Sequence, residues 1–282
     1  KETQMQINLF EVSEGYKRLD KMGDPLEKIS KNVKWEGLKE VLKPITFDQG
    51  KKGGRPACDA MIIIKSLLLQ SLYNIADGAC EYQINDRMSF KRFIGLDIAQ
   101  KAPDEKTLWL YRERLKHKGL EAKIFQWFED QVNSAGFTAK KGQIIDASFV
   151  QTPKPSGKHK KQLEEEIVLT QAQKAQIDRE STFTKKRNQH YHGYKNHIQI
   201  DNKYKLIRKH AVSTASTHDS QLLEALLDEK ENTHQEVWAD SAYYSASSEE
   251  LLKEKGLNSH IHQRPYRSKP LSKEQHIRNT IK

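Results

Sequence analysis

The sequence predicts a mixed α/β domain preceded by an all-helical domain. Residues 57–135 place apolar side chains at helical spacing, whereas short apolar segments bounded by Gly and Pro follow from Lys141 onward. Those later segments alternate with helical patterns, which is typical of a sheet with helices packed on it. We therefore expect an all-helical domain at residues 1–140 and an α/β domain at residues 141–282, with a polar insert at 151–195.

The composition excludes several classes of protein. The chain has 282 residues, of which 36% are hydrophobic and 30% charged, so a core can form and wholesale disorder is not expected. Its two cysteines form no CxxC pair, which argues against a disulfide framework or a zinc site. No apolar run approaches the length of a membrane span, and the first residues lack a secretory signal. We expect a cytoplasmic protein without a membrane partner.

The positive charge indicates a polyanionic partner. The formal net charge is +10. Residues 182–210 hold eight Lys or Arg against one acid, and residues 262–282 hold six against one. Clustered basic residues of this kind favour nucleic acid over a merely solvated surface.

The N-terminal elements are predicted in order. Residues 1–50 read as irregular and charged, apart from a short helix near Pro25–Leu42, and "GKKGGRPACDA" reads as an exposed loop. The next helix begins at Asp59 and carries an apolar stripe with Met61, Ile64, Leu68 and Leu72, which Ile63 and Leu67 widen. The remaining helices are expected at residues 75–86, 88–93, 103–119 and 121–134.

The C-terminal elements begin with a strand at residues 143–147 and a polar insert that includes a solvated helix at 163–179. A hairpin is expected from strands at 197–200 and 206–212, followed by an amphipathic helix with Leu222, Leu223, Leu226 and Leu227 as its apolar face. A strand at 235–239, a helix from "SSEELLKEKG", a strand from "LNSHIH" and a possible final helix complete the order. Three strands that meander and two that alternate with helices form the arrangement that ribonuclease H-like domains use.

Two acids stand out in this arrangement. Asp146 lies in "QIIDASFV" and Asp240 in "EVWADSAYYS", each at the end of an apolar strand. If the two strands are neighbours, the carboxylates meet at the sheet edge where α/β domains bind ligands, and a cation is needed to offset their repulsion. Mg²⁺ suits such hard oxygen ligands, and Mn²⁺ is expected to substitute for it. The alternative interpretation is that each Asp is only a turn former or helix cap.

Several segments resemble insertion-sequence transposases of the large group named after insertion sequence five. The N-terminal likeness lies in "GRPACDAMIIIKSLLLQSLYNIADGACEYQINDRMSFKRFIGLD" and "PDEKTLWLYRERL". "GQIIDASFV", "YHGYKNHIQID", "STASTHDS" and "VWADSAYYS" look like the catalytic blocks of the same enzymes, in the same order, over roughly residues 45–265.

The resemblance implies a ribonuclease H-like catalytic domain with an Asp–Asp–Glu triad and Mg²⁺-dependent DNA strand transfer. Asp146 matches the first acid and Asp240 the second. The chain reaches Lys282 before a match to the third, because the neighbours of Glu274 do not fit the spacing. We therefore expect a catalytic domain truncated before its third acid. The alternatives are a truncated, inactive relative that only binds DNA, and a hydrolytic nuclease on the same fold.

The resemblance also implies that the helical domain at residues 1–140 binds DNA. The implied partners are double-stranded DNA at the element ends and the target and a possible second copy of the chain, and the implied location is the bacterial nucleoid. We expect Lys195, Arg55, Lys185, Lys186 and Arg187 to contact DNA. Less specific candidates are Lys91 and Arg92 for the DNA backbone, His218 and Asp219 of the "THDS" block, and His190, His192 and His197 for a transition metal. Ordinary solvation competes for Lys91 and Arg92, packing and helix capping compete for the "THDS" pair, and a basic DNA-facing loop is favoured for the three histidines. Packing is expected for Trp109, Trp127 and Trp238. It is also the default for Tyr243 and Tyr244, which could instead stack on a base.

Overall fold

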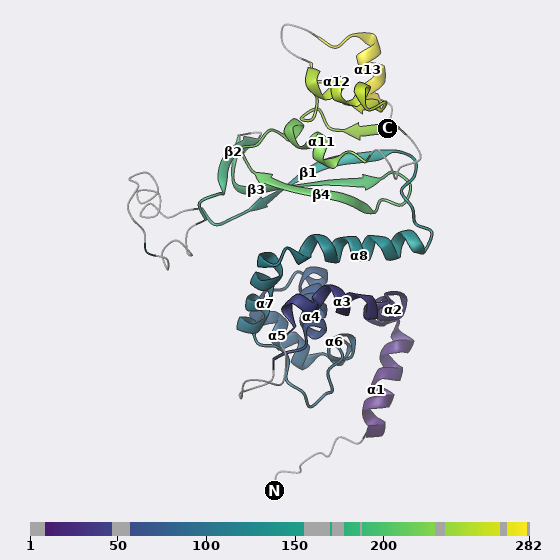
Figure 1. Cartoon of the computed structure of the whole chain (residues 1–282), viewed down its shortest axis with the longest axis vertical. Helices are drawn as coiled ribbons and strands as arrows, with labels where there is room; N and C mark the ends of the chain where they lie inside the picture. The colour runs from purple at the N-terminus through teal and green to yellow at the C-terminus, as the bar shows by residue number, and fades with distance from the viewer. Residues whose placement is uncertain are drawn as a thin grey trace. The chain divides into compact units, whose positions relative to one another are not determined.

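The computed structural model describes residues 9–46, 57–154, 170, 178–186, 188–228, 235–265 and 270–280. The chain divides into two compact units between Ala135 and Gly136, which we call the helical unit (residues 1–135) and the sheet unit (residues 136–282) (Figure 1). Among the described residues, no helix combines the length and apolar character needed to cross a bilayer.

The described part of the helical unit is built from α-helices around one apolar core. Ile63 and Leu69 of α4, Phe90 of α6 and Leu108 of α7 are almost completely buried in it. The helices are α1 (Leu9–Met22), α2 (Pro25–Asn32), α3 (Leu38–Leu42), α4 (Ala60–Tyr73), α5 (Asp77–Asp86), α6 (Met88–Ile94), α7 (Glu105–His117) and α8 (Leu120–Ser134).

The N-terminal segment is more ordered than its charged composition predicts. Residues 9–22 were expected to be irregular, yet they form α1. The reason is tertiary: Arg92 of α6 forms ion pairs of 2.7 Å with both Asp20 and Asp24, which hold the end of α1 against α6. The neighbouring Lys91 is buried and donates to two backbone carbonyl oxygens. Lys91 and Arg92 therefore hold parts of the helical unit together. The sequence predicted DNA contacts for these two residues and not this structural role.

The sheet unit contains a mixed sheet with strand order β2-β3-β1-β5-β6, and β4 also pairs with β3. β3 runs antiparallel to its partners, whereas β1, β5 and β6 run parallel to one another. The strands are β1 (Gln143–Gln151), β2 (Thr182–Lys186), β3 (Gln189–Asp201), β4 (Ile207–Thr214), β5 (Glu236–Ala239) and β6 (Asn258–Ile261).

Three local predictions differ from this sheet. The polar insert contains β2, and β3 begins at Gln189 rather than at His197, because the two segments pair with each other as an exposed ribbon. The amphipathic helix after β4 is reduced to a 3-10 turn at Asp219–Leu222 and the single turn α11 (Leu223–Leu226). The solvated helix expected at residues 163–179 lies largely outside the described residues.

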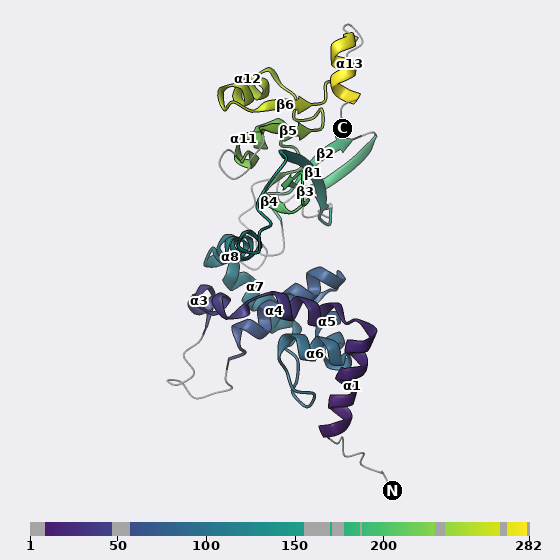
Figure 2. The ribbon, with the colours of Figure 1, turned by 90° about the vertical axis from the view of Figure 1, so that its right-hand side faces the viewer.

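One face of the sheet carries the core of this unit. Leu223 of α11 and Leu252 of α12 (Ala246–Glu254) are fully buried in one cluster with Ile145 and Val237 of the strands. Figure 2 shows both helices on the same side of the strands. The final helix, α13 (Lys273–Thr280), contacts β6. Because side chains alternate along a strand, Ile144 and Asp146 must point to the face opposite this core.

Gly142, just before β1, is a position where only glycine fits. Its φ is +81°, and a Cβ there would lie 2.6 Å from the Glu236 carbonyl oxygen on the segment that starts β5. We expect Gly142→Ala to destabilise the sheet unit by about 1–3 kcal/mol more than Gly136→Ala, which has a similar φ of +88° but open space around its Cβ. Urea unfolding of both variants measures the difference. Equal losses would show that the conformation alone, and not the close approach of β1 to β5, requires glycine.

Candidate active site

The sheet places Asp146 and Asp240 side by side. β1 and β5 are parallel neighbours, and Ile145 pairs with Ala239 at the last register position. Asp146 directly follows Ile145, and Asp240 directly follows Ala239, so both acids lie at the same end of the paired segment. The two strands are therefore neighbours, as the site prediction required. The structure differs in one respect, because β1 does not end at Asp146 but continues to Gln151.

Both carboxylates are exposed, and each is held by one backbone N–H group. Asp146 Oδ1 accepts a hydrogen bond of 2.7 Å from Ala147 N, and Asp240 Oδ1 accepts one of 2.8 Å from Ala242 N. Within the described residues, neither side chain forms an ion pair, so each Oδ2 remains available. Two anions at one site are disfavoured unless a cation shares them. The local geometry therefore orients the acids while leaving oxygen ligands free.

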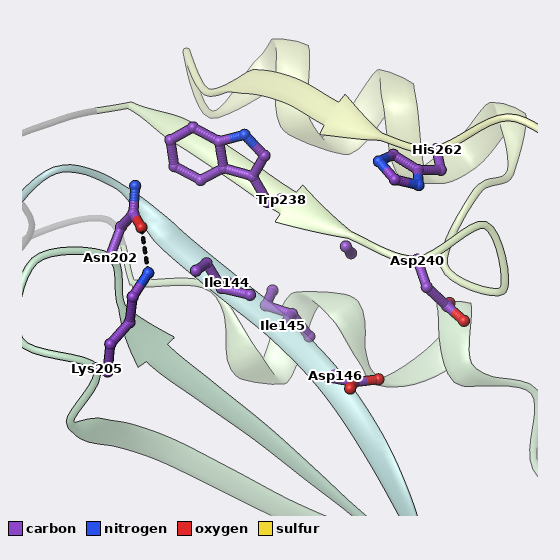
Figure 3. A pocket seen from close by; sticks show the side chains of 9 residues that line it. Ile144, Ile145, Asp146, Asn202, Lys205, Trp238, Asp240 and His262 are labelled. Carbon is purple, nitrogen blue, oxygen red and sulfur yellow. Dashed lines mark hydrogen bonds between the residues drawn. The ribbon is translucent and has the colours of Figure 1, made fainter. Parts of the chain in front are cut away.

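A pocket of about 520 Å³ contains both acids. Figure 3 shows Asp146 and Asp240 toward one end of it, with Asn202 and Lys205 toward the other. Its remaining lining comes from residues on β1, on β5 and just after β6: Ile144, Ile145, Trp238, Ala239 and His262. The sequence did not predict Asn202, Lys205 or His262 as site residues. They follow strand ends whose registers are unknown before the sheet is assembled.

A buried hydrogen-bonded chain fixes the loop that carries Asp240. Tyr243 is fully buried, and a hydrogen bond of 2.9 Å joins its hydroxyl to His197 Nδ1 on β3; a second bond of 2.9 Å joins His197 Nε2 to Ser213 on β4. Burial raises the pKa of the Tyr243 hydroxyl above its ordinary value, and burial lowers the pKa of His197. A protonated phenol therefore donates to a neutral imidazole, which donates to Ser213. These hydrogen bonds connect the Asp240 loop to β3, and β3 pairs with β1, the strand that carries Asp146.

Lys195 lies on the inward side of β3. Its side chain is 11% exposed, and its ammonium donates to Asp219 Oδ1 and to the Thr217 carbonyl oxygen, both at 2.7 Å. This ion pair connects β3 to the "THDS" segment and explains the presence of Asp219 there. The cap of the following 3-10 turn is His218, whose ring nitrogen accepts from Ser220 N. A phosphate contact by Lys195 stays a prediction that would compete with these bonds.

The other residues predicted to contact DNA are distributed differently. Lys185 and Lys186 are exposed on β2, and the Lys186 ammonium lies 5.6 Å from the centre of the Phe149 ring. Arg55 and Arg187 lie outside the described residues. The structure therefore places two of these cations on an accessible ribbon of the sheet unit.

The histidines do not form a transition-metal site in the described residues. Both ring nitrogens of His192 are hydrogen-bonded, to Thr152 and to Ser181, and both of His197 are engaged as described above. In the same part of the chain, no group of three or more His, Cys, Asp or Glu side chains could hold a metal ion. A cation at the pocket would therefore take its described protein ligands from two carboxylates.

Two family models and one solved structure are similar to this chain. Residues 13–114 match a family described as a transposase domain of the DUF772 type, and residues 138–281 match the transposase DDE domain. A cryo-EM structure of the piggyBac transposase synaptic complex with hairpin DNA is similar with 14% identity and a TM-score of 0.39. The match covers 86% of this chain and 50% of that one, so the chain spans half the length of that solved protein.

Fold and site together define a ribonuclease H-like domain with a two-acid site, preceded by a helical unit. The chain belongs to the transposase DDE domain family, whose match covers more than half of it. The family implies dependence on a divalent metal ion. The site fits such an ion, since two exposed carboxylates with free oxygens are hard ligands and leave room for water and phosphate.

Proposed function

We propose that this chain is a DNA transposase that binds the terminal inverted repeats of its element and catalyses metal-dependent strand cleavage and transfer. One observation carries the proposal: Asp146 and Asp240 come from neighbouring parallel strands and face one pocket. Membership of the DDE family supports it. The whole protein would act on double-stranded DNA at the element ends and at the target.

Asp146 and Asp240 hold the metal ion, for which we propose Mg²⁺, with Mn²⁺ as a substitute. When bound, such an ion polarises a phosphoryl oxygen and stabilises the charge that develops on the attacked phosphate. The hydrogen bonds from Ala147 N and Ala242 N keep one oxygen of each acid oriented during the reaction. In cleavage, an oxygen of water forms a bond to phosphorus and the bond to the 3′ oxygen breaks. In transfer, that 3′-hydroxyl attacks a target phosphodiester and displaces its 3′ oxygen.

The remaining residues predicted to contact DNA belong to this proposal. Lys185 and Lys186 offer exposed charges to a phosphate backbone, and Lys195, Arg55 and Arg187 extend the same prediction. The helical unit is proposed to recognise the terminal repeats. A homodimer would bring two ends together. Action on chromosomal DNA would place the protein at the bacterial nucleoid, in the cytoplasm.

The test is a strand-transfer assay with the purified chain. Duplexes carrying the inverted repeats that flank its gene are incubated with Mg²⁺, Mn²⁺ or EDTA, and products are separated on denaturing gels. We expect cuts at the repeat ends and joined products when 3′ ends and target DNA are supplied, and neither in EDTA. Cutting without joining would instead indicate a nuclease, and specific binding without either reaction would indicate a protein that only binds DNA.

A further inference from the structure

The segment that follows β6 passes beside Asp240 and is fixed on two sides. His262 N donates to the Ala239 carbonyl oxygen at 3.2 Å, which extends the pairing of β5 and β6 by one step. Gln263 and Asn279 of α13 form two reciprocal hydrogen bonds of 2.9 Å. The backbone position of the next residue, Arg264, is therefore set by β5 on one side and by α13 on the other.

The side chain of Arg264 is held by the residue that follows Asp240. Its Nε donates to the hydroxyl oxygen of Ser241 at 2.5 Å, and Ser241 directly follows Asp240. In the part of the chain that the structure describes, this is the only hydrogen bond of the guanidinium, and no carboxylate oxygen lies within 4.0 Å of it. Arg264 is exposed. The two terminal Nη groups of this exposed side chain therefore donate no hydrogen bond within the described residues.

A guanidinium held in this way matches a phosphate. Its planar fork donates two parallel hydrogen bonds to two oxygens, and a side chain that is already oriented loses less rotational freedom on binding. The surroundings favour an anion of the backbone type, because a second cation, Lys205, lies toward the far end of the pocket from Asp240 (Figure 3). Two acids alone would repel DNA, and flanking cations offset that repulsion.

We propose that Arg264, oriented by Ser241, binds a DNA backbone phosphate next to the Asp146 and Asp240 site. The proposal rests on the proposed function, since it names a substrate contact of the same site. It assigns Arg264 to substrate binding and Ser241 to positioning. The sequence signal was weak, because Arg264 lies in a basic tail where ordinary solvation explains an arginine equally well.

The test measures DNA binding by the full chain in Ca²⁺, so that binding is read without cutting. We expect Arg264→Ala to weaken binding roughly ten- to a hundredfold, the effect of losing a hydrogen bond to a charged group. The slope of log affinity against log salt should fall by about 0.9, the value for one phosphate. Arg264→Lys should keep the slope but recover only part of the affinity. Lys253→Ala, which removes an exposed charge on α12 outside the pocket, should change neither.

Methylphosphonate substitution identifies the phosphate. Neutralising the linkages of the repeat-end duplex one at a time should reveal one position near the cleavage site that weakens wild-type binding but has no further effect on Arg264→Ala. The proposal is overturned if the variant responds to every linkage as the wild type does. Because this scan needs no cleavage, a chain that binds with the expected pattern but never cuts would refute only the proposed catalysis. A chain that does not bind the DNA would refute both.

Discussion

Asp146→Asn and Asp240→Asn are each expected to lower metal-dependent cleavage by at least about a thousandfold. The metal supplies several kcal/mol of transition-state stabilisation, and each ~1.4 kcal/mol is a factor of ten in rate. Asparagine removes the charge that attracts the ion but keeps an oxygen in the place of Oδ1. That oxygen can still accept from Ala147 N or Ala242 N, the bonds that hold each side chain in the wild type.

The fold and the DNA affinity of these variants should be retained. Both acids are exposed, and substitutions at such positions usually change stability by less than about 0.5 kcal/mol. Glu236→Gln is the matched control, because it removes one negative charge from the opposite end of β5 and should leave the cleavage rate unchanged. The rise in melting temperature on adding Mn²⁺ should be seen in the wild type and the control and be lost in both asparagine variants. Cleavage at the wild-type rate by either asparagine variant would remove that acid from the site.

The sequence predicted the two acids because each interrupts a short apolar segment, where a carboxylate without a partner would be costly to bury. It predicted that the two acids lie close together only if their strands are neighbours in the sheet. Nothing in "QIID" or "EVWAD" states that β1 and β5 are parallel neighbours; that follows from the crossover and from the packing of Ile145 and Val237 under α11 and α12. The family resemblance supplied the pairing that periodicity could not.

The strand β3 shows why charge and hydropathy misplace individual residues. Lys195, His197, Gln199 and Asp201 alternate on its inward side, and all are buried, whereas Ile198 and Ile200 point outward. A rule that turns apolar residues inward therefore assigns the two faces of this strand the wrong way round. Three of these inward polar side chains have side-chain partners: Asp219 for Lys195, Tyr243 for His197 and Arg208 for Asp201. The side-chain nitrogen and oxygen of Gln199 are buried without a hydrogen-bond partner among the described residues.

Helix α4 shows a related limit in the helical unit. The predicted stripe included Ile63, which is fully buried, but also Leu72, which is 50% exposed. It did not include Leu69 or Ser66, which are fully buried as well. Apolar residues surround most of this helix, so its periodicity predicts that a helix forms but not which side faces the core. The contacts made by neighbouring helices decide that.

Arg208→Met is expected to destabilise the sheet unit by about 3–5 kcal/mol, the usual loss when one member of a buried ion pair is removed. Asp201 is completely buried and Arg208 is 4% exposed, with Arg208 Nε 3.2 Å from Asp201 Oδ1. Without Arg208, Asp201 would remain as a buried charge held by the N–H groups of Tyr204 and Leu206, at 2.6 and 3.2 Å. These two bonds place the expected loss toward the lower end of the range.

The double variant Asp201→Asn with Arg208→Met distinguishes the cause of that loss. If the uncompensated charge is responsible, neutralising Asp201 should recover part of the stability, because the single amide oxygen of asparagine can still accept from one of the two N–H groups of the turn. Urea unfolding followed by Trp238, the one tryptophan in residues 136–282, measures both variants, and Arg179→Met controls for the loss of an exposed arginine. No recovery would mean that Arg208 acts through packing and its bond to the Phe137 carbonyl oxygen. The pair closes the turn that presents Asn202 and Lys205 to the pocket, so its stability is also a condition for the geometry of the site.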